Sequence, residues 1–426
     1  MNTNRLEDFI NANRGDFDNL EPSEKVWKNI EKNTRKVRKL SPVVYLLRIA
    51  AMMLVVIGLS VVLIKTGTFK SGQLAKQADP SRDVVLLEAG QAGCGASGRN
   101  GGFVSASITH NFGNGFTRWR KELPQLLELG HKNLAEIEAA IERFHIDCDY
   151  VRSGELNVAL EPYQLDGMKE EREEAAPYGE NYTLYDERQV RALINSPLFI
   201  GGSWNPANGM VNPARLAWGL RRACLEAGVR LFEETRARAL EEGAGTVIVK
   251  TDYGQVESKK VALATNAFPP LLKRLSLFMI PVYDYVLMTE PLSREQRAAI
   301  GWRGREGLSD SANQFHYSQI TTDGRILWGG YDAVYYRNNA VAPHLERCPE
   351  TFARLAEHFF QVFPQLTGLR FTHAWGGVID ACSRYTAFWD RAYGGKAAYV
   401  LGYTGLGVGA ARFGAQVMLD LLDGKK

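Results

Sequence analysis

A short buried strand followed by a glycine-rich loop constrains the fold more than any other stretch of this chain. Asp83 to Glu88 reads DVVLLE, an apolar run ending in an acid, which is typical of a buried parallel strand whose C-terminal end meets a ligand. Gly93 to Gly102 then provides a backbone that a ligand can approach closely, as in loops that cradle phosphates or flavin edges. Two alternatives stay open: Glu88 as an exposed strand-end acid, and the loop as a flexible surface segment.

A second glycine turn lies near the C-terminus, between the candidate strand Ala398 to Leu401 and the candidate helix Ala410 to Leu422. Its sequence from Gly402 to Gly409 is GYTGLGVG. A strand, a glycine turn and a helix N-terminus together form a site for negative charge, here suited to a flavin pyrimidine ring. A turn that only packs a strand against a helix is the alternative.

Helical patterns, buried strands and hairpin signals are interleaved along the rest of the chain. For example, Asp323-Gly324 predicts a hairpin between His316 to Thr321 and Arg325 to Gly329. We therefore expect a mixed α/β fold, in which a Rossmann-like nucleotide-binding unit carries an inserted antiparallel β-rich substrate unit.

Composition narrows the classes of function. The chain has 51 Lys and Arg against 48 Asp and Glu, a formal net charge of +3, which gives no broad electrostatic reason to expect nucleic acid as a partner. The five cysteines are scattered without a C-x-x-C spacing, and the seven histidines show no ligand spacing. Neither a disulfide framework nor a metal site is therefore indicated.

An apolar run from Val43 to Ile64, interrupted only by Arg48, is long enough to cross a hydrocarbon core of about 30 Å. We predict a single transmembrane helix over residues 43–65. The Lys- and Arg-rich flank before it places the N-terminus in the cytoplasm by the positive-inside rule. A buried core helix and a cleaved signal peptide are the alternatives. This topology puts the large domain across the membrane, which conflicts with its free thiols.

Residues 1–42 are predicted to be a helical N-terminal segment, and residues 66–80 a linker with a remnant helix. Residues 1–42 together with the predicted transmembrane helix weakly resemble the small single-pass, anti-sigma-like membrane proteins of Bacteroidetes. A plain membrane-proximal anchor is the other interpretation.

From about Leu74 to Gly424 the chain resembles the glycine/D-amino-acid-oxidase (DAO) family of FAD-dependent oxidoreductases, most closely its γ-glutamylputrescine-oxidase-like members. Several motifs carry this resemblance and stand in the family's order: Val84–Gly90, Gly95–Gly102, Asn212-Pro213, Ala264–Ala267, Thr289–Leu292 and Gly402–Gly407.

The resemblance implies FAD as the cofactor and an oxidoreductase domain over residues 81–426. Its FAD-binding parts would be about 81–150, 210–270 and 370–426, and its substrate-domain parts about 151–209 and 271–369. The implied reaction is hydride transfer from a C–H beside an amine nitrogen to the flavin, so a small amine or amino acid is the expected partner. No catalytic acid or base is assigned.

The residues that the resemblance assigns to the cofactor fall into four groups. Glu88 and Ala89 would hold the adenosine ribose, the glycine loop would line the pyrophosphate and the flavin, a second loop would close over the nucleotide, and the C-terminal turn would address the flavin N1/C2 edge. The members of the last three groups are Ala96, Ser97, Gly98, Arg99, Asn100, Gly101 and Gly102; Thr265 and Asn266; and Gly402, Tyr403, Thr404, Gly405, Leu406, Gly407 and Val408.

Four aromatic side chains are predicted to line the substrate pocket. Tyr283 and Tyr285 alternate onto one face of a strand that leads into Thr289-Glu290-Pro291, and His316 and Trp328 lie on the Asp323-Gly324 hairpin. Packing within a β-sheet core explains all four equally well.

The resemblance breaks at the N-terminal end, where the family has a strand and a G-x-G-x-x-G turn that this chain lacks. We therefore expect an N-terminally truncated Rossmann-like domain whose neighbouring strands lose hydrogen-bond partners and whose activity is impaired. The chain would be a truncated or chimeric gene, a fusion in which the apolar segment substitutes for the strand, or a non-catalytic remnant. A single-pass membrane regulatory or structural protein with a degenerate flavoprotein domain is the alternative function, and an NAD-linked dehydrogenase is a third.

Overall fold

The computed structural model describes residues 60–64 and 81–425. All of them belong to one compact unit, residues 59–426. The predicted N-terminal helical segment, most of the predicted span and the predicted linker lie outside the described residues.

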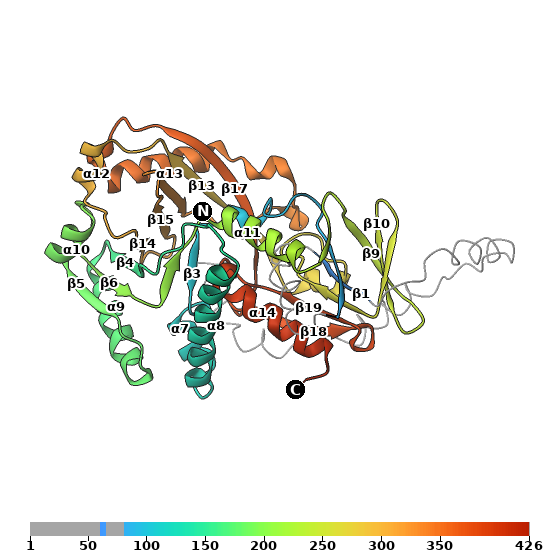
Figure 1. Cartoon of the computed structure of the whole chain (residues 1–426). Helices are drawn as coiled ribbons and strands as arrows, with labels where there is room; N and C mark the ends of the chain where they lie inside the picture. The colour runs from blue at the N-terminus through green and yellow to red at the C-terminus, as the bar shows by residue number, and fades with distance from the viewer. Residues whose placement is uncertain (1–59, 65–80, 426) are drawn as a thin grey trace. The chain divides into compact units, whose positions relative to one another are not determined.

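A six-stranded sheet forms the first part of the unit (Figure 1). Neighbouring strands from β19 through β12 and β1 to β2 and β8 run parallel, while β18 pairs antiparallel with β19. In spatial order the strands are β18 (Phe388–Ala392), β19 (Ala397–Leu401), β12 (Lys260–Leu263), β1 (Ser60–Ile64), β2 (Asp83–Leu87) and β8 (Arg230–Phe232).

Strand β1 corrects two of the expectations from sequence. Ser60–Ile64 was expected within a transmembrane helix, but it is a strand that pairs with β2 on one side and β12 on the other. The strand thought missing from the sheet is therefore present, because an extended β-branched segment supplies backbone N–H and C=O groups to both neighbours. Over the described ranges, no helix has both the length and the apolar character needed to cross a bilayer.

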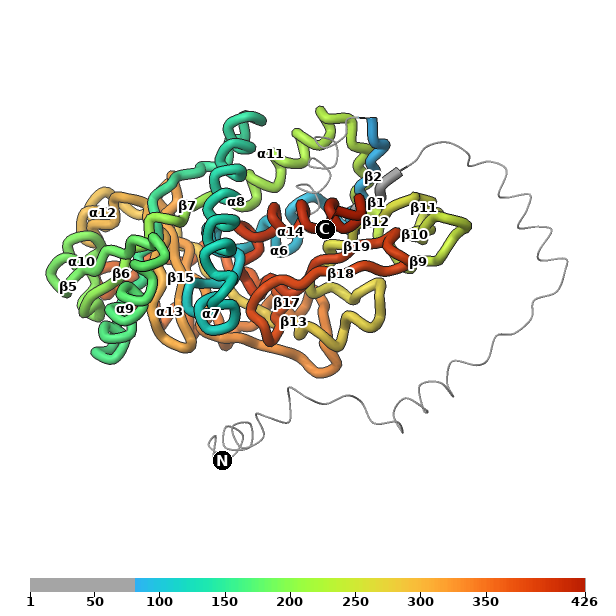
Figure 2. Tube along the Cα trace, turned by 90° about the horizontal axis from the view of Figure 1, so that it is seen from below, coloured from blue at the N-terminus to red at the C-terminus, as the bar shows by residue number. Residues whose placement is uncertain are grey.

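The two faces of this sheet are covered differently. One face packs Val84, Leu86 and Val400 against helices, and the other packs Val85 and Leu87 against a small sheet. The helices are α8 (Leu123–Arg143), α11 (Pro213–Glu226) and α14 (Gly407–Leu422), and the small sheet contains β9 (Ala237–Glu242), β10 (Val247–Thr251) and β11 (Gln255–Ser258). Figure 2 shows α14 lying beside α8, with which it is in contact.

An eight-stranded, mostly antiparallel sheet forms the second part of the unit. Its strands in spatial order are β17 (Phe371–Ala381), β13 (Ile280–Thr289), β16 (Ile326–Gly330), β15 (His316–Ile320), β14 (Gly307–Asp310), β4 (Glu155–Ala159), β6 (Gly201–Asn205) and β5 (Thr183–Asp186). One of its faces packs on α13 (Pro349–Val362) through Leu355 and Phe359. The remaining elements are a ribbon of β3 (Phe103–Ser105) with β7 (Asn208–Met210), and the helices α6 (Ala96–Arg99), α7 (Phe112–Arg118), α9 (Pro162–Ala175), α10 (Glu187–Leu193) and α12 (Arg294–Ile300).

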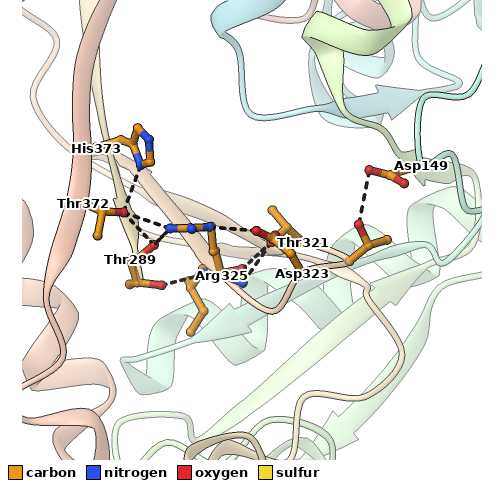
Figure 3. A network of polar contacts seen from close by, with 9 residues as sticks. Asp149, Thr289, Thr321, Asp323, Arg325, Thr372 and His373 are labelled. Carbon is orange, nitrogen blue, oxygen red and sulfur yellow. Dashed lines mark hydrogen bonds and ion pairs between the residues drawn. The ribbon is translucent and has the colours of Figure 1, made fainter. Parts of the chain in front are cut away.

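The mixed α/β fold and the hairpin at Asp323-Gly324 agree with the sequence analysis. The domain bounds given there stay a prediction. Figure 3 shows how the hairpin is tied to its neighbours: Arg325 donates to the carbonyl of Thr289 on β13 (3.0 Å) and to the hydroxyl of Thr372 on β17 (3.0 Å). Its Nε also donates to Asp323 in the turn, at 2.8 Å. These bonds hold β16 in register with β13 and β17.

Candidate active site

The C-terminal edge of the parallel sheet collects three of the four predicted cofactor groups. Strands β2, β12 and β19 end at Leu87, Leu263 and Leu401, so Glu88, Thr265 and Gly402 follow at the same edge. Three strand spacings separate the Glu88 end from the Gly402 end, about 14 Å. This edge therefore matches an elongated ligand better than a compact one.

Glu88 is buried, with 2% of its surface exposed, which removes the alternative of a solvent-exposed strand-end acid. Its Oε1 accepts a hydrogen bond from the backbone N–H of Gly90 at 2.8 Å. The carboxylate is thus held at the strand end by the first turn of the glycine loop.

The glycine loop is packed so closely that side chains are excluded at two positions. A Cβ built on Gly98 would lie 2.1 Å from the carbonyl oxygen of Gly93, and one on Gly102 would lie 2.2 Å from that of Val211. Gly102 also has a φ of +80°, a conformation that L residues rarely adopt. Asn100 braces the loop, since its side chain donates to Ala96 O (2.8 Å) and accepts from Gly102 N (2.9 Å). The loop is therefore closely packed and internally hydrogen-bonded, which favours a built site over the alternative of a loose surface segment.

Strand β17 connects the glycine loop with the loop that contains Thr265 and Asn266. Trp375 donates from Nε1 to the carbonyl of Arg99 (2.9 Å), and Arg99 donates to the carbonyl of Gly376 (3.3 Å). Asn266, which has a φ of +50°, donates from Nδ2 to the carbonyl of Val378 at 3.3 Å.

The C-terminal turn meets the end of the same strand. Asp380 accepts hydrogen bonds from the backbone N–H of Gly402 (2.6 Å) and of Tyr403 (3.2 Å). Residues 375–380 of β17, a stretch of about 17 Å, therefore touch three segments that lie more than a hundred residues apart in the chain.

Burial of Asp380 raises the pKa of its carboxyl to about 7, although the backbone N–H groups of the turn oppose this shift. The turn itself is left-handed at Gly402 (φ +81°), Thr404 (φ +50°) and Gly405 (φ +90°). Helix α14 begins directly after it, at Gly407. The first N–H groups of a helix have no intrahelical partner, so this end is suited to a partly negative ligand edge.

One face of the eight-stranded sheet is turned toward the glycine loop, and it carries residues other than the four predicted substrate residues. Gln319 on β15 donates to the carbonyl of Gly101 at 2.7 Å, and a Cβ on Gly101 would lie 2.6 Å from the ring of Tyr317. The Tyr317 hydroxyl in turn donates to Asp284.

Asp284 is an acidic residue on this face, and burial raises its pKa to about 6. Burial also raises the pKa of Tyr317, with the neighbouring Asp284 as a further cause, so its hydroxyl stays protonated. Strand alternation supplied a signal for Asp284, because a strand that puts Tyr283 and Tyr285 on one face must put Asp284 on the other.

The four predicted substrate residues lie on the opposite face. Tyr285 donates to the carbonyl of Leu345 at 2.7 Å, and Tyr283 to that of Ala342 at 3.3 Å. His316 stacks on Trp328 with ring centroids 4.7 Å apart. The structure does not bring these side chains to the glycine loop, because helix α13 and residues 342–345 cover their face of the sheet. Packing within the core of the sheet, the alternative given in the sequence analysis, therefore accounts for these four side chains.

These residues fit the FAD that the resemblance implies. Glu88 is a buried acid at a parallel strand end, the glycine loop presents backbone where a Cβ has no room, and a left-handed turn precedes a helix N-terminus. Residues 65–80, which follow β1, lie outside the described part of the chain.

Comparisons with known proteins agree with this geometry. The family model "DAO: FAD dependent oxidoreductase" matches residues 72–421. The chain is similar to gamma-glutamylputrescine oxidoreductase of Escherichia coli, with 29% identity over 82% of this chain and 79% of that protein. It is also similar to the probable oxidoreductase OrdL of Haemophilus influenzae, with 26% identity over 86% and 85%. These matches span most of the chain and do not support the alternative of a membrane regulatory protein.

Solved structures share the fold. Glycine oxidase from Geobacillus kaustophilus superposes with a TM-score of 0.71 at 17% identity, covering 86% of this chain and 95% of that one. L-proline dehydrogenase from P. horikoshii superposes with a TM-score of 0.70 at 18% identity, covering 87% and 95%.

Proposed function

The chain belongs to the DAO family of FAD-dependent oxidoreductases, which act on amines or amino acids, and we propose that it oxidises the C–N bond of a small amine. FAD, when bound, supplies the acceptor for the hydride that leaves the carbon beside the nitrogen. The observation that carries the proposal is the strand β17, whose residues 375–380 join the glycine loop, the Asn266 loop and the C-terminal turn.

Each predicted cofactor group has a role in this proposal. Glu88 accepts hydrogen bonds from the adenosine ribose, Ala96 to Gly102 line the pyrophosphate and the flavin, and Thr265 with Asn266 closes over the nucleotide. Gly402 to Val408 address the flavin N1/C2 edge. The protein contributes a shaped, pre-formed backbone surface and removes water from it, and it needs no dedicated acid or base.

We infer that the substrate lies on the side of the sheet that carries Asp284, Tyr317 and Gln319, because this face touches Gly101 of the glycine loop. A carboxylate on this face favours a substrate with a cationic amino group over one held by its own carboxylate. An amine resembling the γ-glutamylated diamine named for the E. coli relative is therefore the first substrate to test.

Impaired activity was predicted because the chain was thought to lack a strand and a G-x-G-x-x-G turn. Strand β1 occupies the centre of the sheet, so the first of these two reasons no longer applies. The test is the visible spectrum of the purified full-length chain with and without added FAD. It is followed by oxygen uptake or dye reduction with γ-glutamylputrescine, putrescine, glycine and proline. A flavin spectrum near one FAD per chain and turnover with an amine support the proposal. A chain that binds no FAD after reconstitution contradicts it.

A further inference from the structure

Asp380 is a buried carboxylate that the proposed chemistry leaves unassigned. Only 2% of its surface is exposed, and its two carboxylate oxygens accept from the N–H groups of Gly402 at 2.6 Å and Tyr403 at 3.2 Å. Its own backbone carbonyl accepts from Thr404 N at 3.2 Å. A single residue thus binds three consecutive N–H groups of the C-terminal turn.

These three hydrogen bonds constrain the backbone conformation of the turn. Three of its four residues from Gly402 to Gly405 have a positive φ, which a free chain rarely adopts in succession. Asp380 accepts from the N–H groups at the start of the turn, and helix α14 begins shortly after the turn, at Gly407. Thr404 adds a bond back to the strand, its hydroxyl accepting from Cys382 N at 3.2 Å.

Within the described residues, Asp380 forms no ion pair. The titratable side chains close to it are the buried Tyr403, whose pKa burial and Asp380 raise, and Cys382, which bonds to Thr404 and to the carbonyl of Gly402. A phenol that stays neutral does not offset a carboxylate, so an ionised Asp380 acts on a negatively charged neighbour through a medium of low polarity.

We propose that Asp380 is a positioning residue for the flavin-facing turn, and that its charge lowers the reduction potential of the flavin held there. The inference rests on the proposed function, since it takes Gly402 to Val408 as the segment that addresses the flavin. Reduction adds negative charge beside the turn, and an ionised carboxylate behind the same turn opposes that charge.

The experiment compares wild type with Asp380→Asn and Asp380→Ala, and uses Asp310→Asn as the matched control. The side chain of Asp310 is also mostly covered, with 7% exposed, and has a hydrogen-bonded partner, His316 at 2.8 Å. His316 in turn contacts His358 of α13, so Asp310 lies near the face that α13 covers. Amide hydrogen exchange of the FAD-free proteins reports on the turn alone, and FAD titration with potentiometry reports on the cofactor.

Both Asp380 variants are expected to speed exchange at residues 402–404, and Asp380→Ala to weaken FAD binding about tenfold or more. Asp380→Asn is expected to shift the flavin potential to more positive values. Burial raises the pKa of Asp380 to about 7. The difference in flavin potential between wild type and Asp380→Asn should therefore be largest above pH 8 and should disappear below pH 6, where the wild-type carboxyl is neutral. Asp310→Asn should change none of these quantities.

Faster exchange with an unchanged FAD affinity and potential would reduce Asp380 to a purely structural role and overturn the inference. A gap in potential that is the same at pH 6 and pH 8 would also overturn it. If the wild-type chain binds no FAD, the proposed function is contradicted instead. The exchange data would then still show whether Asp380 stabilises the turn.

Discussion

Tyr317 on β15 hydrogen-bonds to Asp284 on β13 across the intervening strand β16, passing over Gly329. The phenol therefore lies flat on the sheet, with one edge against Gly101 of the glycine loop. This pair links the proposed substrate side of the sheet to the glycine loop.

Tyr317→Phe is expected to lower the free energy of unfolding by about 1–3 kcal/mol, because it leaves a buried carboxyl without its hydroxyl partner. Urea denaturation at pH 7 measures the change. Tyr335→Phe is the control, since Tyr335 is 72% exposed and should change stability little. Equal effects of the two substitutions would contradict the importance of the pair.

Asp284→Asn is expected to change the pH dependence of stability. The pKa of Asp284 is raised from 3.8 to about 6 in the folded protein, so ionisation favours the unfolded chain. The stability that the neutral carboxyl provides is present below pH 3.8 and is lost as pH rises toward about 6. The free energy of unfolding lost through ionisation of Asp284 amounts to about 3 kcal/mol.

Wild type should therefore lose stability relative to Asp284→Asn between pH 4 and pH 7.5, measured by denaturant unfolding at both pH values. A difference between the two proteins that does not depend on pH would show that Asp284 titrates normally in the folded state.

Gly329→Ala is expected to cost about 1–3 kcal/mol, because the new Cβ would lie 2.7 Å from Cζ of Tyr317. It should also weaken FAD binding, since Tyr317 supports Gly101. The control is Gly167→Ala in helix α9, where a Cβ meets nothing within 4 Å, and which should stabilise by about 0.5–1 kcal/mol. Thermal unfolding and FAD titration of both variants provide the comparison.

Val62→Pro tests whether residues 60–64 form strand β1 of the six-stranded sheet. Val62 pairs with Val85 on β2 and Val261 on β12, and proline removes a backbone donor from the middle of a central strand. We expect a loss of about 3 kcal/mol or more together with the loss of FAD. Val62→Ile keeps the backbone donor and should retain both. If Val62→Pro folds and binds FAD like wild type, β1 is not part of the functional sheet.

Local patterns in the sequence were sufficient for several parts of the fold and of the site. The strand before Glu88, the glycine loop and the turn before α14 were predicted correctly, because buried runs and glycine turns depend on neighbouring residues. The Asp323-Gly324 hairpin followed from turn chemistry in the same way. The family resemblance added FAD and the class of reaction.

Tertiary structure alone decided the rest. An apolar β-branched run suits a membrane helix and a buried strand equally. For Ser60–Ile64 the choice was made by pairing with β2 and β12, whose partner residues lie 23 and 199 positions farther along the chain. Alternation separated Asp284 from Tyr283 and Tyr285, but only the packing of α13 determined which side faces the cofactor loop. Strand β17 joins segments from three distant parts of the chain, and such contacts leave no trace in local sequence because they depend on how whole sheets are stacked.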